Sequence, residues 1–111
     1  MKNNKKIYLG KIYRVEDASG VSHPGKPYKA YRKKRKYDVI KFTTEKKKSY
    51  KLQNNIDSNS NKPCYVRKRP ERFGDSYIKE EYPNYQVRNN QDKQTLKKVK
   101  RNKIKVWGKN K

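Results

Sequence analysis

Runs of lysine and arginine are the side chains of this sequence best suited to chemistry. The chain has 33 Lys and Arg against 10 Asp and Glu, which gives a formal net charge of +23. A protein that neutralises phosphates releases their counterions, so such a surface binds a polyanion strongly and in a salt-dependent way. Charge in this excess also opposes a compact state and favours an anionic partner. The densest runs are Arg32 to Lys36, Lys46 to Lys48, Arg67 to Arg69 and Lys97 to Lys105.

Tyrosines are interleaved with these basic runs. Basic grooves lined with aromatic rings hold phosphates and stack bases, so the pattern predicts a surface that binds nucleic acid. Each tyrosine taken singly has the alternative of a position in the core or at its rim. The residues expected to bind nucleic acid are Arg32, Lys33, Lys34, Arg35, Lys36, Arg67, Lys68, Arg69, Lys97, Lys98, Lys100, Arg101, Tyr28 and Tyr31.

Few residues could act as a nucleophile, an acid or a base. His23 lies in the segment Ser22-His23-Pro24-Gly25, where an imidazole could exchange protons near neutral pH. The alternative for His23 is a lone exposed loop histidine. Thr43 and Thr44 end the strongest strand pattern, where a barrel commonly presents side chains to a site. Simple β-propensity is the alternative for both threonines.

Neither a metal nor a cofactor is expected. Cys64 is the sole cysteine and His23 the sole histidine. A single cysteine excludes an intramolecular disulfide and a multi-cysteine zinc site. Basic neighbours could lower the pKa of the Cys64 thiol, but a small buried residue in a strand is the favoured interpretation. A glycine-rich phosphate loop is also absent, because Gly25-Lys26-Pro27 lacks the spacing and the following helix of one.

Short strand patterns separated by loops that contain Gly and Pro dominate the chain. They predict a mainly β fold, a small barrel, with little helix. The turn residues predict loops at 16–27, 53–63 and 70–75. A helix is expected from Asn90 to about Arg101, with an acid near its amino end. The expected strands cover residues 7–15, 28–31, 37–44, 49–52, 64–67 and 76–78.

Three parts follow from these elements: a flexible basic leader at 1–6, a barrel domain at 7–88, and a basic helix and tail at 89–111. Only 30% of residues are hydrophobic, which is also typical of disorder. The many tyrosines and Trp107 favour a folded domain, because aromatic side chains bury a large area each. No apolar run approaches the roughly 20 residues of a membrane-spanning helix, and no signal peptide is recognised, so a cytoplasmic location is expected.

Three segments, taken in order, carry a resemblance to a known family. They are Gly10-Lys11-Ile12-Tyr13-Arg14-Val15, a loop that ends in Gly25-Lys26-Pro27, and Val39-Ile40-Lys41-Phe42-Thr43-Thr44. This order resembles the MazF/PemK-like toxins. Those proteins begin with a Gly-x-Ile-x-x-Val strand, continue with a loop that ends in Gly-Arg-Arg-Pro or Gly-x-Arg-Pro, and then have a strand ending in Thr or Ser. The resemblance covers about residues 9–66.

The resemblance implies an SH3-like barrel that cleaves single-stranded RNA without a metal, usually as a homodimer inhibited by an acidic protein. RNA is for this reason favoured over DNA as the partner. Lys26 would take the family's arginine position, and Thr43 or Thr44 its hydroxyl position, near His23. Lys26 lacks the bidentate fork with which arginine grips a phosphate. The C-terminal part of the chain has no counterpart in the family.

The sequence leaves three functions open. One is a toxin-type endoribonuclease of a mobile element, which requires Lys26, His23 and Thr43 to converge across one groove. Another is a non-catalytic RNA- or DNA-binding protein of a phage or plasmid, which inhibits or assists a nucleoprotein complex such as a CRISPR effector. Its basic residues would spread over a continuous face. The third is a ribosome-associated or membrane-surface protein.

Overall fold

Eight strands and one α-helix form the part of the chain that the structure, a computed structural model, describes, which is residues 6–106. The strands are β1 (Tyr13–Glu16), β2 (Ser22–Tyr31), β3 (Lys36–Thr43), β4 (Ser49–Lys51), β5 (Tyr65–Arg67), β6 (Glu71–Gly74), β7 (Ile78–Glu81) and β8 (Lys105–Val106), and the helix is α1 (Asn90–Lys100). Two 3-10 turns, η1 (Arg32–Lys34) and η2 (Asp75–Tyr77), connect them. Residues 1–5 of the predicted leader and 107–111 of the predicted tail lie outside the described residues.

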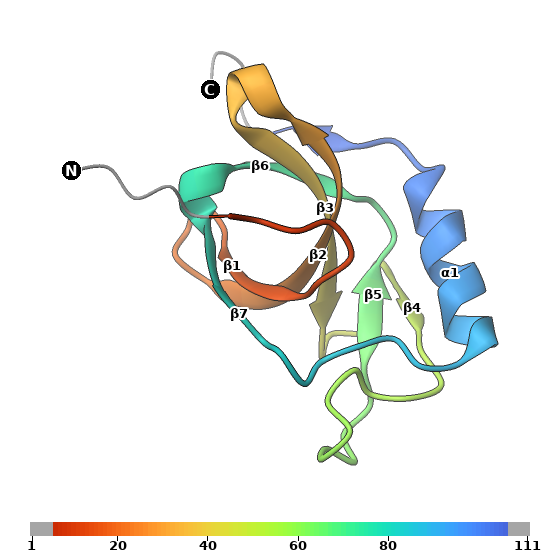
Figure 1. Cartoon of the computed structure of the whole chain (residues 1–111). Coiled ribbons are helices and arrows are strands. Elements are labelled where there is room, and N and C mark those ends of the chain that lie inside the picture. The colour runs from red at the N-terminus through yellow and green to blue at the C-terminus, as the bar shows by residue number, and fades with distance from the viewer. Residues whose placement is uncertain (1–5, 107–111) are drawn as a thin grey trace.

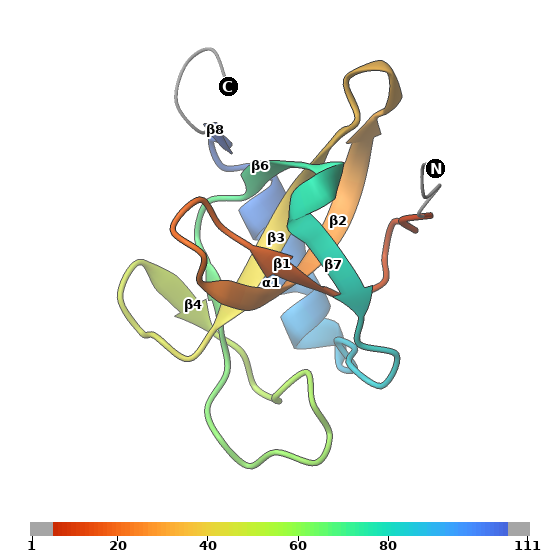
Figure 2. The same ribbon diagram turned by 90° about the vertical axis from the view of Figure 1, so that its left-hand side faces the viewer.

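The strands form one strongly curled sheet, with α1 packed alongside it (Figures 1 and 2). The main path through the sheet runs β4-β5-β3-β2-β1-β7, and β6 pairs with both β3 and β8. Neighbouring strands are antiparallel except in the short β6–β8 pair. The predicted fold class, a mainly β barrel-like fold with a short C-terminal helix, is confirmed.

Strand β3 lies at the centre of the fold. Every residue from Asp38 to Thr43 is buried. One edge of β3 pairs with β2, and the other pairs with β6 along its first half and with β5 at its end. A strand that is enclosed on both faces carries a nearly continuous apolar run. This is why the segment from Tyr37 to Thr44 is the strongest strand pattern in the sequence.

Two hydrophobic cores lie on the two faces of β3. Alternate side chains of a strand point to opposite faces, so Val39 enters one core while Ile40 and Phe42 enter the other. The first core consists of Ile7, Tyr13, Val15, Val39, Phe73 and Ile78. The second core lies under α1 and consists of Ile12, Ile40, Phe42, Leu52, Ile56, Cys64, Val66, Leu96 and Val99.

Helix α1 is held at its first turn by a buried carboxylate. The Asn89 side chain caps the helix by accepting a hydrogen bond from the Asp92 amide at 2.8 Å. The Asp92 carboxylate accepts hydrogen bonds from the backbone amides of Gln53 and Asn54, at 2.8 and 3.1 Å. The predicted helix is therefore confirmed. The sequence pattern did not indicate that its acid ties the helix to the loop after β4.

The loop predicted over residues 16–27 is wrong in its second half, because β2 begins at Ser22 and runs through both prolines. Pairing with β3 starts only at Gly25, so Pro24 has a strand on one side alone. Pro27 lies where the β2–β3 register shifts, at a bulge. Proline is tolerated in sheets at such positions, where the ladder requires no N–H from it.

The loop predicted at 70–75 is also wrong, because it contains β6. Phe73 is fully buried in the first core, and Glu71 is buried against a lysine of β3. These two tertiary contacts override turn residues that favour a loop. The predicted burial of Cys64 is confirmed, since it belongs to the second core and burial raises the pKa of its thiol, although it lies just before β5 and not within it.

Two predicted strands have shifted boundaries. Residues 7–12 precede β1 and include a turn at Gly10, whose φ is +92°. The strand predicted at 76–78 is a 3-10 turn up to Tyr77, and β7 starts at Ile78. The strands expected at 37–44, 49–52 and 64–67 are present as β3, β4 and β5.

Replacing Gly25 with alanine should destabilise the fold by about 1–3 kcal/mol, since an added methyl group overpacks the core. A Cβ at this position would lie 2.7 Å from Val39 Cγ1 and 3.0 Å from Val15 Cγ2. Gly74→Ala is the matched control, because its nearest neighbour would be a Tyr77 ring carbon at 3.8 Å. Urea unfolding of both variants measures the difference. Equal stabilities would contradict the close packing of β2 on the first core.

Candidate nucleic-acid interface

A hollow of about 680 Å³ brings together cations that are far apart in the sequence. They come from β3, from the turn between β3 and β4, from β5 with the residues that follow it, and from β8. We call this the basic hollow, and its cations are Lys41, Lys47, Lys48, Arg67, Lys68, Arg69 and Lys105. The composition gives the amount of positive charge but not its location, and the fold concentrates part of it in this hollow.

A buried ion pair lines the basic hollow. Lys41 Nζ of β3 lies 3.0 Å from Glu71 Oε1 of β6, and their side chains are 10% and 6% exposed. Removing one partner of such a pair leaves an uncompensated buried charge, which costs several kcal/mol, about 3–5. Lys41 is therefore held in place by β6, the strand that pairs with the first half of β3.

Arg67 and Arg69 are fixed by hydrogen bonds beside this pair. The Arg67 guanidinium lies 2.6 Å from Glu45 Oε1 and donates to the Lys47 carbonyl at 2.8 Å. Arg69 Nε donates to the Lys103 carbonyl at 3.0 Å. The hydrogen bond from Arg67 lowers the pKa of Glu45. The arginines are thus oriented before any ligand is bound.

The carboxylates of the chain are already committed to partners, and this leaves cations in excess. All ten Asp and Glu lie within the described residues. Asp17, Asp57 and Asp92 accept hydrogen bonds from backbone amides. The potential over the remaining surface is therefore strongly positive. The carboxylates that pair with Lys or Arg are Glu16, Asp38, Glu45, Glu71, Asp75, Glu80 and Glu81.

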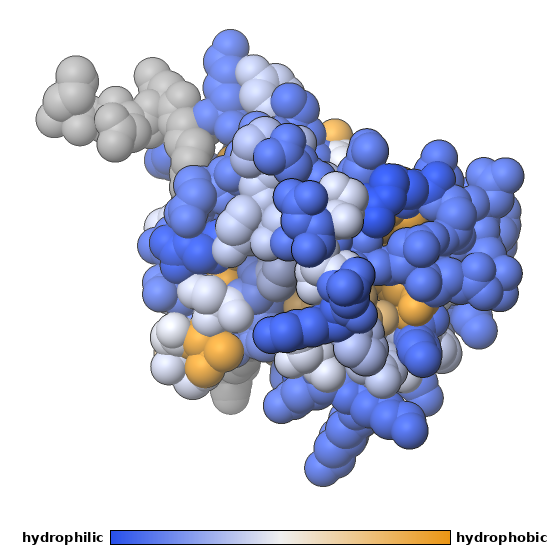
Figure 3. Space-filling view, turned by 90° about the horizontal axis from the view of Figure 1, so that it is seen from below, coloured by the Kyte–Doolittle hydropathy of each residue, from blue (hydrophilic) through white to orange (hydrophobic). Residues whose placement is uncertain are grey.

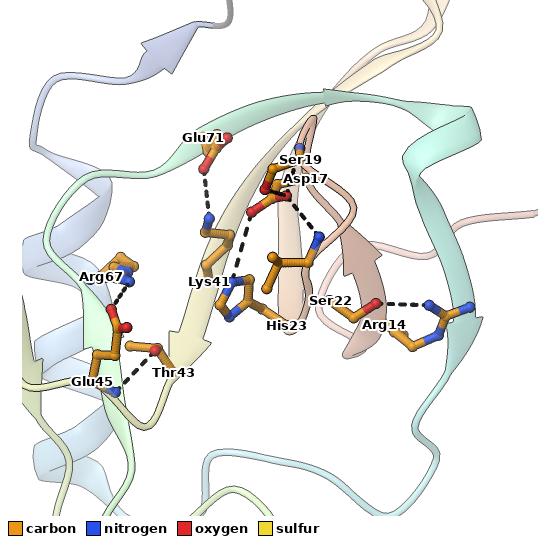
Figure 4. Close-up of polar contacts among 11 residues, drawn as sticks. Arg14, Asp17, Ser19, Ser22, His23, Lys41, Thr43, Glu45, Arg67 and Glu71 are labelled. Carbon is orange, nitrogen blue, oxygen red and sulfur yellow. Dashed lines mark hydrogen bonds and ion pairs between the residues drawn. The ribbon is translucent and has the colours of Figure 1, made fainter.

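His23 lies at the boundary between the basic hollow and a second hollow of about 360 Å³. Figure 4 shows it on β2 beside Lys41, with Asp17 reaching toward it from the turn after β1. Burial, followed by the charge of Lys41, lowers the pKa of His23 below its ordinary 6.5, although Asp17 opposes this. The imidazole is consequently neutral at pH 7.

The second hollow is lined mainly by uncharged side chains, with Glu45, Asp57 and Lys62 as the charged ones, and we call it the neutral hollow. Its walls come from the ends of β2 and β3 and from the loop between β4 and β5. Thr43 and Thr44 both line it, so the structure brings these two predicted residues to the same place as His23. The Thr43 hydroxyl accepts a hydrogen bond from the Glu45 amide at 3.1 Å.

Lys26 does not join them. In the β2–β3 register Gly25 lies opposite Lys41 and Lys26 lies opposite Ile40. Alternation along β2 therefore puts Lys26 on the face of the second core and His23 on the opposite face. Burial, and then the charges of Lys100 and Lys93 on α1, lower the pKa of Lys26. The structure therefore does not bring Lys26 together with His23 and Thr43, as the toxin-type mechanism requires.

The predicted nucleic-acid residues fall into three groups. Arg67, Lys68 and Arg69 line the basic hollow. Residues 32–35 form the turn of the β2–β3 hairpin, and Lys36 begins β3. Of the cations of α1, Lys98 is connected to the hollow through Tyr50, because Lys68 Nζ and Lys98 Nζ lie 5.3 and 4.4 Å from its ring centroid. Lys100 Nζ instead lies 5.5 Å from the Tyr28 ring centroid, and Arg101 is the C-cap of the helix.

Tyr28 and Tyr31 have packing roles. The ring of Tyr31 is covered by the Arg72 guanidinium at 4.4 Å, and its hydroxyl donates to Asp38 at 2.7 Å. Tyr28 packs against the second core, and burial raises its pKa to about 12. Both tyrosines therefore occupy core or rim positions, which was the alternative to a role in binding nucleic acid.

Lys41 and Lys105 were not predicted as site residues. Lys41 lies inside the strongest strand pattern. A lysine there needs a buried partner of opposite charge, and the sequence does not show which residue that is. Lys105 reaches the hollow because β8 pairs with β6. The repeated cations of residues 46–48 were a visible signal for Lys47 and Lys48.

Hydrophilic side chains dominate the face seen in Figure 3, with only small hydrophobic spots between them. Over residues 6–106, no three His, Cys, Asp or Glu side chains gather in a way that could hold a metal ion. Within the same range, no helix has the length and apolar character needed to cross a membrane.

Comparison with protein-family models, with curated proteins and with solved structures found no match for this chain. The resemblance to MazF/PemK-like toxins therefore remains a prediction from the sequence.

Stability should fall as the pH is lowered from 7 to 5.5, because the unfolded chain takes up a proton at His23 before the folded chain does. His23→Gln should flatten this slope, and His23 is the only histidine. Thermal unfolding across this range measures the slope, and NMR titration of the single imidazole measures the pKa. A midpoint at or above 6.5 would contradict the described environment.

Proposed function

We propose that this protein binds nucleic acid, with backbone phosphates held in the basic hollow. The observation that carries the proposal is the gathering of seven cations from separate segments around one hollow. Lys41 and Arg67 are each paired with a glutamate there, so the remaining cations are the ones that meet phosphates. Among these, Arg69 is already oriented by its hydrogen bond to the Lys103 carbonyl and so binds phosphate with little loss of side-chain entropy.

The basic surface continues from the hollow onto α1, and this favours a chain-like ligand over a single small anion. Lys68 lies at the hollow, Tyr50 lies between, and Lys98 lies on the helix. A groove of cations with aromatic rings can follow a backbone over several nucleotides. The neutral hollow beside it has room for an unstacked base. Since unpaired bases are the usual targets in RNA recognition, RNA is the favoured ligand.

Lys47→Gln combined with Lys68→Gln should weaken single-stranded RNA binding roughly tenfold, and should reduce the slope of log K against log salt by about 1.4. Both residues line the hollow, so the loss should be similar for different RNA sequences. Fluorescence anisotropy over a series of salt concentrations measures both quantities.

Lys11→Gln combined with Lys79→Gln is the matched control. It removes the same charge from the β1–β7 side, where these lysines pair with Glu81 and Glu16. Its affinity should change less than threefold, which is about 0.6 kcal/mol. If the two double variants lose affinity equally, phosphates do not bind in the basic hollow.

A second candidate function is metal-independent RNA cleavage, and the position of His23 favours it. A neutral imidazole stands between the two hollows, with Thr43 on the same face. It could accept the proton of a ribose 2′-hydroxyl as that oxygen attacks the adjacent phosphorus. The 5′-oxygen would leave with a proton from solvent, giving a cyclic phosphate. A cation of the basic hollow that is not paired with a glutamate would stabilise the charge that develops on the phosphorane.

If the protein cleaves RNA, His23→Gln should lower the rate by about 100-fold or more with EDTA present, because a general base contributes about that much. Lys26→Gln should retain most of the rate, since Lys26 lies on the opposite face of β2. Gel analysis of labelled RNA measures both rates. The opposite order of effects would refute this assignment. Binding without cleavage by the wild-type protein would leave the binding function alone.

A further inference from the structure

The β2–β3 hairpin projects from the body of the protein as an arm, in both views of the ribbon (Figures 1 and 2). Its tip is the turn η1, which consists of Arg32, Lys33 and Lys34, all exposed. Because a 3-10 turn has three residues per turn, three successive side chains point in three directions. Among residues 6–106, none of the carboxylates pairs with these three cations.

The arm is braced against the rest of the protein near its tip. Arg35 Nε lies 2.9 Å from Asp75 Oδ2, and the Asp75 amide donates to the Arg35 carbonyl at 2.9 Å. Arg35 has φ +55°, so the turn is closed by a left-handed residue that this contact holds in place. The tip is therefore joined to η2, which belongs to a different part of the chain.

The shaft of the arm is braced by a buried polar network. Asp38 is fully buried, and Arg72 Nε of β6 donates to it at 2.7 Å. The Tyr31 hydroxyl donates to Asp38 at 2.7 Å and accepts from Arg72 at 2.9 Å. Satisfied buried networks of this kind rigidify the elements that they join. The arm is thus preorganised rather than ordered on binding.

The dimensions of the tip select the kind of partner. Strand β6 pairs with β3 from Lys36 to Val39, so residues 32–35 are the part of the arm that extends beyond a third strand. Paired strands lie about 5 Å apart, and a turn of that width with its side chains fits the roughly 12 Å wide major groove of B-form DNA. The major groove of A-form RNA is too narrow for it. Cations that point in three directions can reach phosphates on both sides of such a groove, whereas a flexible single strand requires no projecting element.

We propose that the arm inserts its cationic tip into the major groove of B-form duplex DNA. This inference rests on the proposed function and adds to it: the arm binds duplex DNA as a second ligand, whereas the basic hollow binds single-stranded RNA. The arm and the basic hollow involve opposite ends of β3, so each can be removed without the other.

The combined variant Arg32→Gln, Lys33→Gln and Lys34→Gln should weaken binding to a duplex DNA about tenfold. It should change binding to a duplex RNA of the same sequence, and to a single-stranded RNA, less than about threefold. Lys11→Gln, Lys51→Gln and Lys79→Gln together remove the same charge elsewhere and should show no preference among the three probes. Anisotropy titrations at one salt concentration, with thermal unfolding to verify the fold, provide the measurements.

Asp75→Asn tests the bracing of the arm, because bracing and simple electrostatics predict opposite changes in the affinity for duplex DNA. It removes one negative charge and so raises the net charge by one, and a purely electrostatic tip would therefore bind duplex DNA more tightly. A braced tip would bind about threefold more weakly, because ordering it would now cost free energy on binding. Tighter binding by Asp75→Asn overturns the preorganised arm.

The two proposals fail in different ways. If the arm variant loses the same factor on all three probes, the groove proposal is overturned while binding at the hollow stands. If the wild-type protein binds none of the probes, the proposed function itself is overturned, and the arm proposal falls with it. Both proposals are supported if the arm variant loses affinity for duplex DNA alone and keeps the wild-type slope of log K against log salt on single-stranded RNA.

Discussion

Two ion pairs of opposite polarity between β3 and β6 hold the structure together. Asp38 of β3 is bound by Arg72 of β6, and Lys41 of β3 is bound by Glu71 of β6. Both β3 residues are buried, so each needs the partner that β6 supplies, and a shifted register would leave two charges unpaired in the interior. These pairs favour the observed register of β6 against β3, the strand that connects the arm to the basic hollow.

The same strand carries both candidate elements. The arm begins at the start of β3, and the basic hollow and the neutral hollow lie at its end. Eight residues of extended chain span about 26 Å, so the two elements are held at a fixed separation by one buried strand. A protein of this size has little room for separate domains. Instead, the two proposed contacts lie at the two ends of a single element.

The sequence predicted what depends on local pattern and composition. The mainly β fold, β3, the helix with its acid and the burial of Cys64 all follow from periodicity, capping chemistry or residue size. It could not predict β6 or the strand character of residues 22–27. Glu71 and Phe73 are stabilised in β6 by contacts with β3, and Gly25 is required by two valines of other strands. Such contacts have no signal within the segment itself.

The candidate site was predictable in charge but not in geometry. Basic runs identified Arg67 to Arg69 and the hairpin tip, whereas the position of Lys41 depends on strand pairing. The resemblance grouped Lys26 with His23 and Thr43 by their order along the chain. The parity of residues along β2 separates them, because positions three apart on a strand face opposite sides. A sequence motif shows which residues share a face only if the segment is first recognised as a strand.

All ten carboxylates have hydrogen-bond or ion-pair partners, and this affects which positions can change during evolution. A surface lysine can become arginine, or move along a turn, with little effect on the summed field. A glutamate or aspartate that pairs across strands has no substitute nearby. In a lineage of such proteins, the rare acidic positions should therefore be the slowly changing ones, and the abundant basic positions the variable ones. A search for distant relatives would then be guided better by the spacing of the acids than by the lysine-rich runs that dominate the composition.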